Sequence, residues 1–107
     1  KADKIAKKYL SEAIKALGQK EAFYVALEKA LHNYLKGRLN IETSDLSKEK
    51  IANLLSERQV DNQVILGFEA ILENCELARY TPITNVTMQQ DYDKAATTIN
   101  LIDKQIK

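Results

Sequence analysis

The chain of 107 residues has no tryptophan, one proline and three glycines, so it is poor in the residues that make tight turns. A fold of many short strands is therefore disfavoured, and long helices are expected. The apolar fraction of 45% and the charged fraction of 29% are typical of a folded domain and exclude a disordered chain. A chain of this length, residues 1–107, is expected to form one domain.

Cysteine and histidine each occur once. One cysteine cannot form an internal disulfide, and a single Cys and His do not make a zinc site. The sequence also contains no Gly-rich phosphate loop and no catalytic Ser-His-Asp order. We therefore expect no cofactor and no enzymatic activity. The net charge of +1 disfavours a general nucleic-acid binder, which would be markedly basic.

No apolar run approaches the roughly 20 residues of a membrane span, and no signal-peptide core is present. The sequence begins with Lys1 rather than methionine. We therefore interpret it as a piece of a longer protein.

Apolar residues at helical spacing are what the chain does contain, and they predict an all-α, five-helix bundle. The predicted helices are Asp3–Leu17, Lys20–Leu39, Lys48–Arg58, Asn62–Tyr80 and Met88–Ile106. One shared core is expected to include Phe23, Leu27, Leu31, Phe68, Ile71, Leu72 and Ile99.

The second helix, Lys20–Leu39, has the broadest apolar face, and we expect the others to pack around it. Gly18 is a natural C-cap for the first helix because glycine adopts the left-handed conformation freely. The short turn predicts that the first two helices form an antiparallel αα-hairpin, somewhat like a tetratricopeptide unit. Gly37 and Asn40 are expected to weaken the end of the second helix.

The starts of the helices are predicted from residues whose side chains can accept a hydrogen bond from an unpaired backbone N–H group in the first turn of a helix. Ser47 and Asp61 are the expected N-caps of the third and fourth helices. Thr87 and Gln90 fit a capping box, which predicts that the fifth helix begins at Met88. Pro82 is expected to stop the fourth helix.

Charge is unevenly distributed along the chain. Residues 1–20 contain six lysines against two carboxylates, whereas residues 61–93 contain six carboxylates against one arginine. The first lysines, Lys1, Lys4, Lys7 and Lys8, fit a solvated helix start, a nucleic-acid patch or the flank just inside a membrane span.

An acidic stripe on the fourth helix places Glu69, Glu73 and Glu76 at positions i, i+4 and i+7. Acid–base or metal chemistry would need burial and further ligands, which the pattern lacks. The stripe is therefore either a solvated helix face or a surface for a basic partner.

His32 and Cys75 are the two residues whose side chains could serve in catalysis or redox chemistry. His32 lies mid-helix and is interpreted as a surface or boundary histidine, since a catalytic role would need a partner from another helix. Cys75 falls on an apolar helix face with acidic neighbours, which favours a packed, unreactive thiol over a redox switch.

Two segments carry a resemblance to a known family. One is KEAFYVALEKALHNYLKGRLNI followed by SDLSKEKI, within residues 20–51, and the other is NCELARYTP, residues 74–82. The second is close to the pattern C-E-[FL]-A-R-Y-x-P. Together they resemble the C-terminal helical domain of the BatD, or aerotolerance (oxygen tolerance), family of bacterial proteins. The matching residues are Cys75, Glu76, Ala78, Arg79, Tyr80 and Pro82.

The resemblance implies an architecture and a set of partners. BatD-like proteins carry extracytoplasmic domains, one membrane span and a cytoplasmic helical tail. Their genes lie beside those of a MoxR-type AAA+ ATPase and of von Willebrand A-domain membrane proteins. The resemblance thus implies a domain on the cytoplasmic side of the bacterial inner membrane, attached through the parent protein's span, with a role in envelope stress. The lysine-rich start would then be the membrane-proximal flank.

These observations lead to the hypothesis of a non-catalytic protein–protein docking domain. The alternatives are a small redox-responsive module that uses Cys75 and a helical nucleic-acid-binding module. The expected partner surface comprises Glu69, Glu73, Glu76, Arg79 and Tyr80. Within it, Arg79 and Tyr80 have two interpretations. In the first, Arg79 pairs with a helix end or a carboxylate and Tyr80 buries its ring. In the second, both stand exposed as a binding hot spot.

Overall fold

The second predicted helix, Lys20–Leu39, is present with the predicted bounds in a computed structural model that describes residues 3–40 and 47–107. The described residues form five helices and no strand, which confirms the all-α five-helix bundle. The helices are α1 (Asp3–Lys15), α2 (Lys20–Leu39), α3 (Lys48–Glu57), α4 (Asn62–Leu77) and α5 (Asn85–Gln105).

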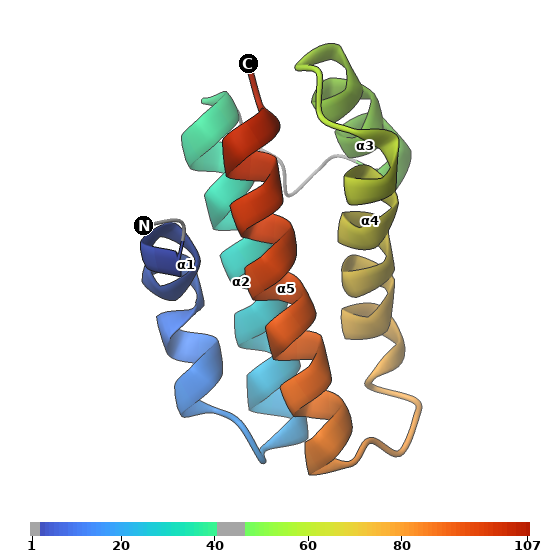
Figure 1. The fold of residues 1–107 in the computed structure, drawn as a ribbon. Helices are drawn as coiled ribbons and strands as arrows, with labels where there is room; N and C mark the ends of the chain where they lie inside the picture. Colours follow the sequence, from blue (N-terminus) through green and yellow to red (C-terminus); the bar gives the residue numbers. More distant parts are fainter. Residues whose placement is uncertain (1–2, 41–46) are drawn as a thin grey trace.

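The helices pack as Figure 1 shows, with α1 and α2 as an antiparallel hairpin joined by a short turn. Gly18 in this turn has a φ of +95°, the conformation that glycine adopts without cost. The likeness of this hairpin to a tetratricopeptide unit stays a prediction. Helix α5 packs against α1, α2 and α4, and α3 packs against α4. The central position that we expected for α2 alone is therefore shared by α2 and α5.

The core is continuous and includes all seven predicted residues, each with 2% or less of its surface exposed. These residues come from α2, α4 and α5, so their burial joins the three helices. Burial of each large apolar side chain stabilises the fold by about 1.5–3 kcal/mol.

Gly37 allows α1 and α2 to approach closely, because it has no side chain. A Cβ atom at this position would lie 3.0 Å from the Tyr9 hydroxyl oxygen of α1. The Tyr9 ring also packs edge-on against Tyr34, with the ring centroids 5.4 Å apart. Helix α2 ends at Leu39, as predicted, and closes with Asn40 in the left-handed conformation. That Gly37 and Asn40 weaken this helix end stays a prediction.

Two predicted N-caps are confirmed and one is wrong. The side chains of Ser47 and Asp61 accept bonds from the backbone N–H groups of residues 50 and 63. Helix α5, however, begins at Asn85 rather than Met88, because the Thr84 hydroxyl accepts the Thr87 N–H at 3.1 Å. Thr87 therefore lies inside the first turn, and α5 gains three residues at its start.

Apart from that of α2, the predicted helix ends are wrong by one to three residues. Helix α1 ends at Lys15, and the two residues that follow make tighter i to i−3 bonds before Gly18. Helix α3 ends one residue early, where Gln59 takes a φ of +69° and the Val60 N–H donates to the Leu55 carbonyl at 3.1 Å. This six-to-one bond closes the helix as a Schellman motif does, with glutamine in the position where glycine is common.

Candidate functional site

The predicted partner surface lies on the solvent side of α4 and in the turn that follows it. Glu69 is half-buried, whereas Glu73 and Glu76 are exposed. Glu76 accepts a bond from the Lys48 ammonium of α3, with Nζ and Oε1 2.8 Å apart. An exposed pair of this kind contributes about 0–1 kcal/mol. The stripe is thus a solvated helix face with one ion pair to α3.

Tyr80 is 83% exposed, so the expectation that its ring is buried under the loop is wrong. The reason is the early end of the helix. Helix α4 ends at Leu77, Ala78 is buried as its C-cap, and the Tyr80 N–H donates to the Leu77 carbonyl at 3.0 Å in a tight turn. This turn carries the tyrosine into solvent.

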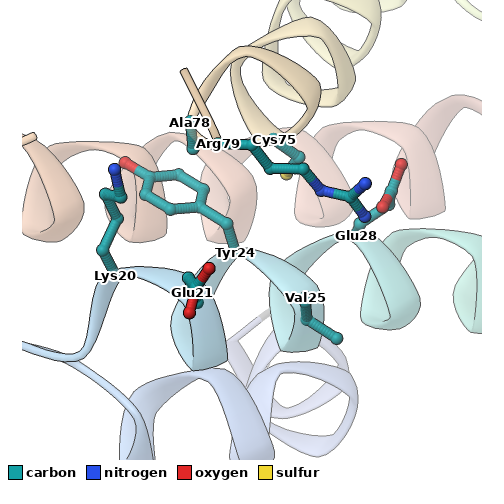
Figure 2. Close-up of a pocket in the computed structure, with 8 residues that line it drawn as sticks. All are labelled: Lys20, Glu21, Tyr24, Val25, Glu28, Cys75, Ala78 and Arg79. Atoms are coloured by element: carbon teal, nitrogen blue, oxygen red, sulfur yellow. The ribbon is translucent and has the colours of Figure 1, made fainter. Parts of the chain in front are cut away.

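Arg79 is exposed next to Tyr80. Its expected pairing with a carboxylate is also wrong, because within residues 3–40 and 47–107 its guanidinium takes part in no hydrogen bond or ion pair. Figure 2 shows the side chain extending from the end of α4 toward Glu28 on α2. The structure therefore has the second of the two arrangements, with both side chains exposed.

A hollow of about 430 Å³ lies between α2 and the end of α4, beside Arg79. Both signs of charge and several apolar groups line it (Figure 2); the residues are Lys20, Glu21, Tyr24, Val25, Glu28, Cys75, Ala78 and Arg79. The Lys20 ammonium donates to the Thr81 carbonyl at 3.0 Å and so joins the start of α2 to the α4–α5 connection. The hollow can accept one side chain of a partner beside the exposed Arg79.

Beneath the hollow, a buried polar group joins three helices. Asp91 on α5 is 3% exposed and accepts the Tyr24 hydroxyl at 2.5 Å and the Asn74 amide at 3.3 Å. Burial, together with the hydrogen bond to Asp91, raises the pKa of the Tyr24 hydroxyl. Sequence analysis missed this cluster, because Tyr24 and Asp91 are 67 residues apart and carry no shared pattern.

Replacing Tyr24 with phenylalanine is expected to lower the free energy of unfolding by about 1–3 kcal/mol, because the buried Asp91 loses its closest donor. Urea titration measures the loss. The matched control is Tyr80→Phe, which alters an exposed ring and is expected to change stability by less than about 0.5 kcal/mol. Equal effects of the two substitutions would contradict the buried bond.

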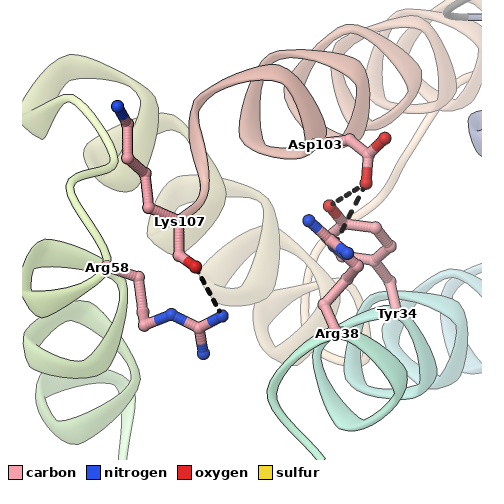
Figure 3. Close-up of polar contacts among 5 residues, drawn as sticks. All are labelled: Tyr34, Arg38, Arg58, Asp103 and Lys107. Carbon is pink, nitrogen blue, oxygen red and sulfur yellow. Dashed lines mark hydrogen bonds and ion pairs between the residues drawn. The ribbon is translucent and has the colours of Figure 1, made fainter.

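A second polar group connects α2 and α5 near the other end of the bundle (Figure 3). Asp103 accepts the Tyr34 hydroxyl at 3.1 Å and lies 3.2 Å from the Arg38 guanidinium. In the same view the Arg58 guanidinium donates to the Lys107 carbonyl at 3.0 Å, which ties the second residue after α5 to the α3–α4 connection. These contacts position helices, and they lie away from the predicted partner surface.

Cys75 is a packed core thiol, as predicted, with 5% of its surface exposed. Burial raises the pKa of the thiol to about 12, and the negative charges of Glu28, Asp91 and Glu76 add to the shift. A reactive cysteine needs the opposite, a lowered pKa and access to solvent. These findings disfavour the redox-responsive alternative.

His32 is half-buried, which confirms the prediction of a boundary position. It lines a second hollow of about 370 Å³ between α2, α3 and α4, together with Glu28, Lys48 and Glu76 among others. Within the described ranges, no group of three or more His, Cys, Asp or Glu side chains is placed to hold a metal ion.

The predicted basic flank is present on α1 as far as the structure describes it. Lys4, Lys7 and Lys8 are exposed, and Lys1 lies outside the described residues. The Lys8 ammonium lies 5.6 Å from the centroid of the Tyr9 ring. Among the described helices, none combines the length and the apolar character that crossing a bilayer requires.

No protein-family model matches the chain, and no curated protein or solved structure matches it significantly. The resemblance to the BatD family therefore stays a prediction, and the candidate site is argued from its own geometry.

Proposed function

We propose that this chain is a non-catalytic protein-docking domain whose contact surface centres on Arg79 and Tyr80. The observation that supports the proposal is the 83% exposure of Tyr80 directly beside the exposed Arg79, whose guanidinium forms no ion pair within the described residues. Tyrosine and arginine are the residue types enriched at binding hot spots, because both bury large areas and still form directed polar contacts.

The surroundings of these two residues suit a contact with a protein. The hollow between α2 and α4 offers a recess for one partner side chain. Leu77 and Val86, which are 51% and 67% exposed, add apolar surface at the end of α4 and the start of α5. A contact that covers an apolar centre with charged residues at its rim is typical of protein interfaces.

The partners we propose are those that the BatD resemblance implies, a MoxR-type AAA+ ATPase or a von Willebrand A-domain membrane protein. On that proposal the domain lies on the cytoplasmic side of the bacterial inner membrane, held there by the parent protein's span. Its contribution to envelope stress tolerance is to bring these proteins together.

Arg79→Ala and Tyr80→Ala are each expected to weaken binding of such a partner by about tenfold or more while the melting temperature changes by less than about 4 °C. Both side chains are exposed and take part in no hydrogen bond or ion pair among the described residues, so stability is expected to be retained. Pull-down and biosensor measurements with purified partners measure binding, and thermal unfolding measures stability. Lys94→Ala, an exposed change on α5, is the control. Wild-type affinity of both variants for every partner that binds the parent domain would refute the proposal.

A further inference from the structure

The solvent side of α4 is an exposed seam with coiled-coil spacing. Its residues on the helix recur at steps of four, three and four; they are Leu66, Ala70, Glu73 and Leu77, and Tyr80 follows in the turn after the helix. All five are exposed, and Leu66 and Leu77 are 50% and 51% exposed. The opposite side of α4 carries the core residues Ile65, Phe68, Ile71, Leu72 and Cys75. Helix α4 is thus apolar on two sides, and the chain covers one of them.

Steps of four and three residues are the pattern by which one helix packs along another. From Leu66 to Leu77 the seam covers three turns, or about 17 Å at a rise of 1.5 Å per residue. A shallow hollow of about 320 Å³ lies on this face and is lined by Lys48, Leu66, Glu69, Ala70 and Glu73. An apolar side chain from a second helix can enter it beside Leu66.

The charge beside the seam is negative. Glu69, Glu73 and Glu76 lie on or next to it, and Lys48 of α3 is the cation placed against them, at 2.8 Å from Glu76. The hydrogen bond that Lys48 donates to Glu76 raises the pKa of Lys48, and the charges of Glu76, Glu73 and Glu69 add to this effect, so all three carboxylates act on one ammonium group. With the exposed Arg79 at the end of the face counted beside Lys48, three carboxylates against two cations still leave the face with net negative charge.

We propose that the exposed face of α4 from Leu66 to Leu77, together with Tyr80 in the turn after it, binds an amphipathic helix of a partner protein. That helix carries apolar residues at steps of three and four and lysine or arginine beside them. The apolar residues cover the seam, and the basic residues pair with Glu69, Glu73 and Glu76. This inference rests on the proposed docking function and names the chemistry of the partner.

A second copy of this chain fits the face less well. Its basic helix, α1, already buries Ala6, Leu10 and Ala13 against the rest of its own bundle. The surface of α1 that stays accessible offers lysines but only one large exposed apolar side chain, Ile14. The accessible surface of α1 therefore has the positive charge that complements the α4 face, but it has too few apolar side chains to cover the α4 seam.

The test is an NMR titration of the ¹⁵N-labelled domain with a synthetic amphipathic peptide that has leucine at steps of three and four and lysine beside the leucines. A matched peptide replaces every lysine with glutamate. The lysine peptide is expected to bind at least about tenfold more tightly, to lose affinity as salt is added, and to shift the amide signals of residues 66–80 most. Absence of binding, shifts centred on α1 or α5, or equal binding of both peptides would overturn the proposal.

Variants of the domain separate the two contributions of the face. The double variant Leu66→Ser/Leu77→Ser and the double variant Glu69→Gln/Glu73→Gln are each expected to weaken peptide binding about tenfold, and the second is expected to reduce the salt dependence. Leu101→Ser and Glu12→Gln, exposed positions on α5 and α1, are the controls and should stay within about twofold of the wild type. Loss of binding in the controls to the same extent would show non-specific adsorption.

The outcomes distinguish this inference from the docking function itself. If partner proteins require Arg79 and Tyr80 but tolerate both double variants, the α4 seam is refuted and docking stands. If the seam binds the lysine peptide and partner proteins bind the Arg79→Ala and Tyr80→Ala variants with wild-type affinity, the proposed centre of docking is refuted instead. A dimer of the free domain by light scattering that the Leu66→Ser/Leu77→Ser variant abolishes would assign the seam to a second copy and overturn the proposal.

Discussion

Leu31→Ala is expected to lower the free energy of unfolding by about 2–5 kcal/mol, enough to remove a large part of the stability of a domain of this size. Leu31 has no exposed surface and lies in the core, to which all five helices contribute. Truncation to alanine removes buried apolar atoms and leaves a cavity that the neighbouring helices fill only in part. Equilibrium unfolding in urea measures the change.

The matched control for this prediction is Leu77→Ala. Leu77 has the same side chain on a helix of the same bundle, but it is 51% exposed. Its truncation is expected to cost less than about 1 kcal/mol, since it removes little buried area. A loss below about 0.5 kcal/mol for Leu31→Ala would place Leu31 at the surface and refute the packing of α2.

The free energy of unfolding is also expected to fall steeply as the pH rises above about 9. Burial raises the pKa of the Cys75 thiol from 9.0 to about 12 and raises the pKa of the Tyr24 and Tyr34 hydroxyls above 10.0. Above the ordinary values the unfolded chain releases these protons, whereas the folded chain keeps them. The stabilisation is therefore complete below pH 9 and is lost toward the raised pKa, by about 1.4 kcal/mol per pH unit for each group.

A series of urea titrations from neutral pH to a pH of about 11 measures this slope. Cys75→Ala removes the thiol, so the free energy of unfolding of the variant should fall less steeply with pH between pH 9 and about 12. The slope of the variant is expected to be smaller than that of the wild type by about 1.4 kcal/mol per pH unit. Its stability at neutral pH is compared separately, since the shorter side chain also changes packing. Identical slopes for the variant and the wild type would show that the thiol is not protected in the folded state.

The helices and the core could be predicted because their signals are local. Apolar residues at steps of three and four placed all seven predicted core residues correctly. Ser47 and Asp61 cap their helices through bonds to residues only two or three positions away, so their role depends on the nearby chain. The inert environment of Cys75 was predictable for the same reason, since its helix face and acidic neighbours are read directly from the sequence.

Where two local signals competed, the sequence did not decide between them. Thr84 and Thr87 can each cap a helix, and Thr84 caps α5 because the chain after Pro82 enters the helix three residues early. The end of α4 had the same ambiguity, because the sequence through Tyr80 has no residue that forbids a helix. The path of the α4–α5 connection ends α4 at Leu77, and this end places Tyr80 in solvent.

The sequence by itself determined the class of the fold, the number of helices, the core and the uneven charge, since each depends on residue type and spacing along one helix. Only the tertiary structure decided which groups meet across helices. Asp91 contacts Tyr24 and Asn74, and Asp103 contacts Tyr34, because α2, α4 and α5 pack together. The exposed seam of α4 was also decided at this level. A helix with apolar residues on two sides can bury either one, and the packing of α2, α3 and α5 determines which side stays open to a partner.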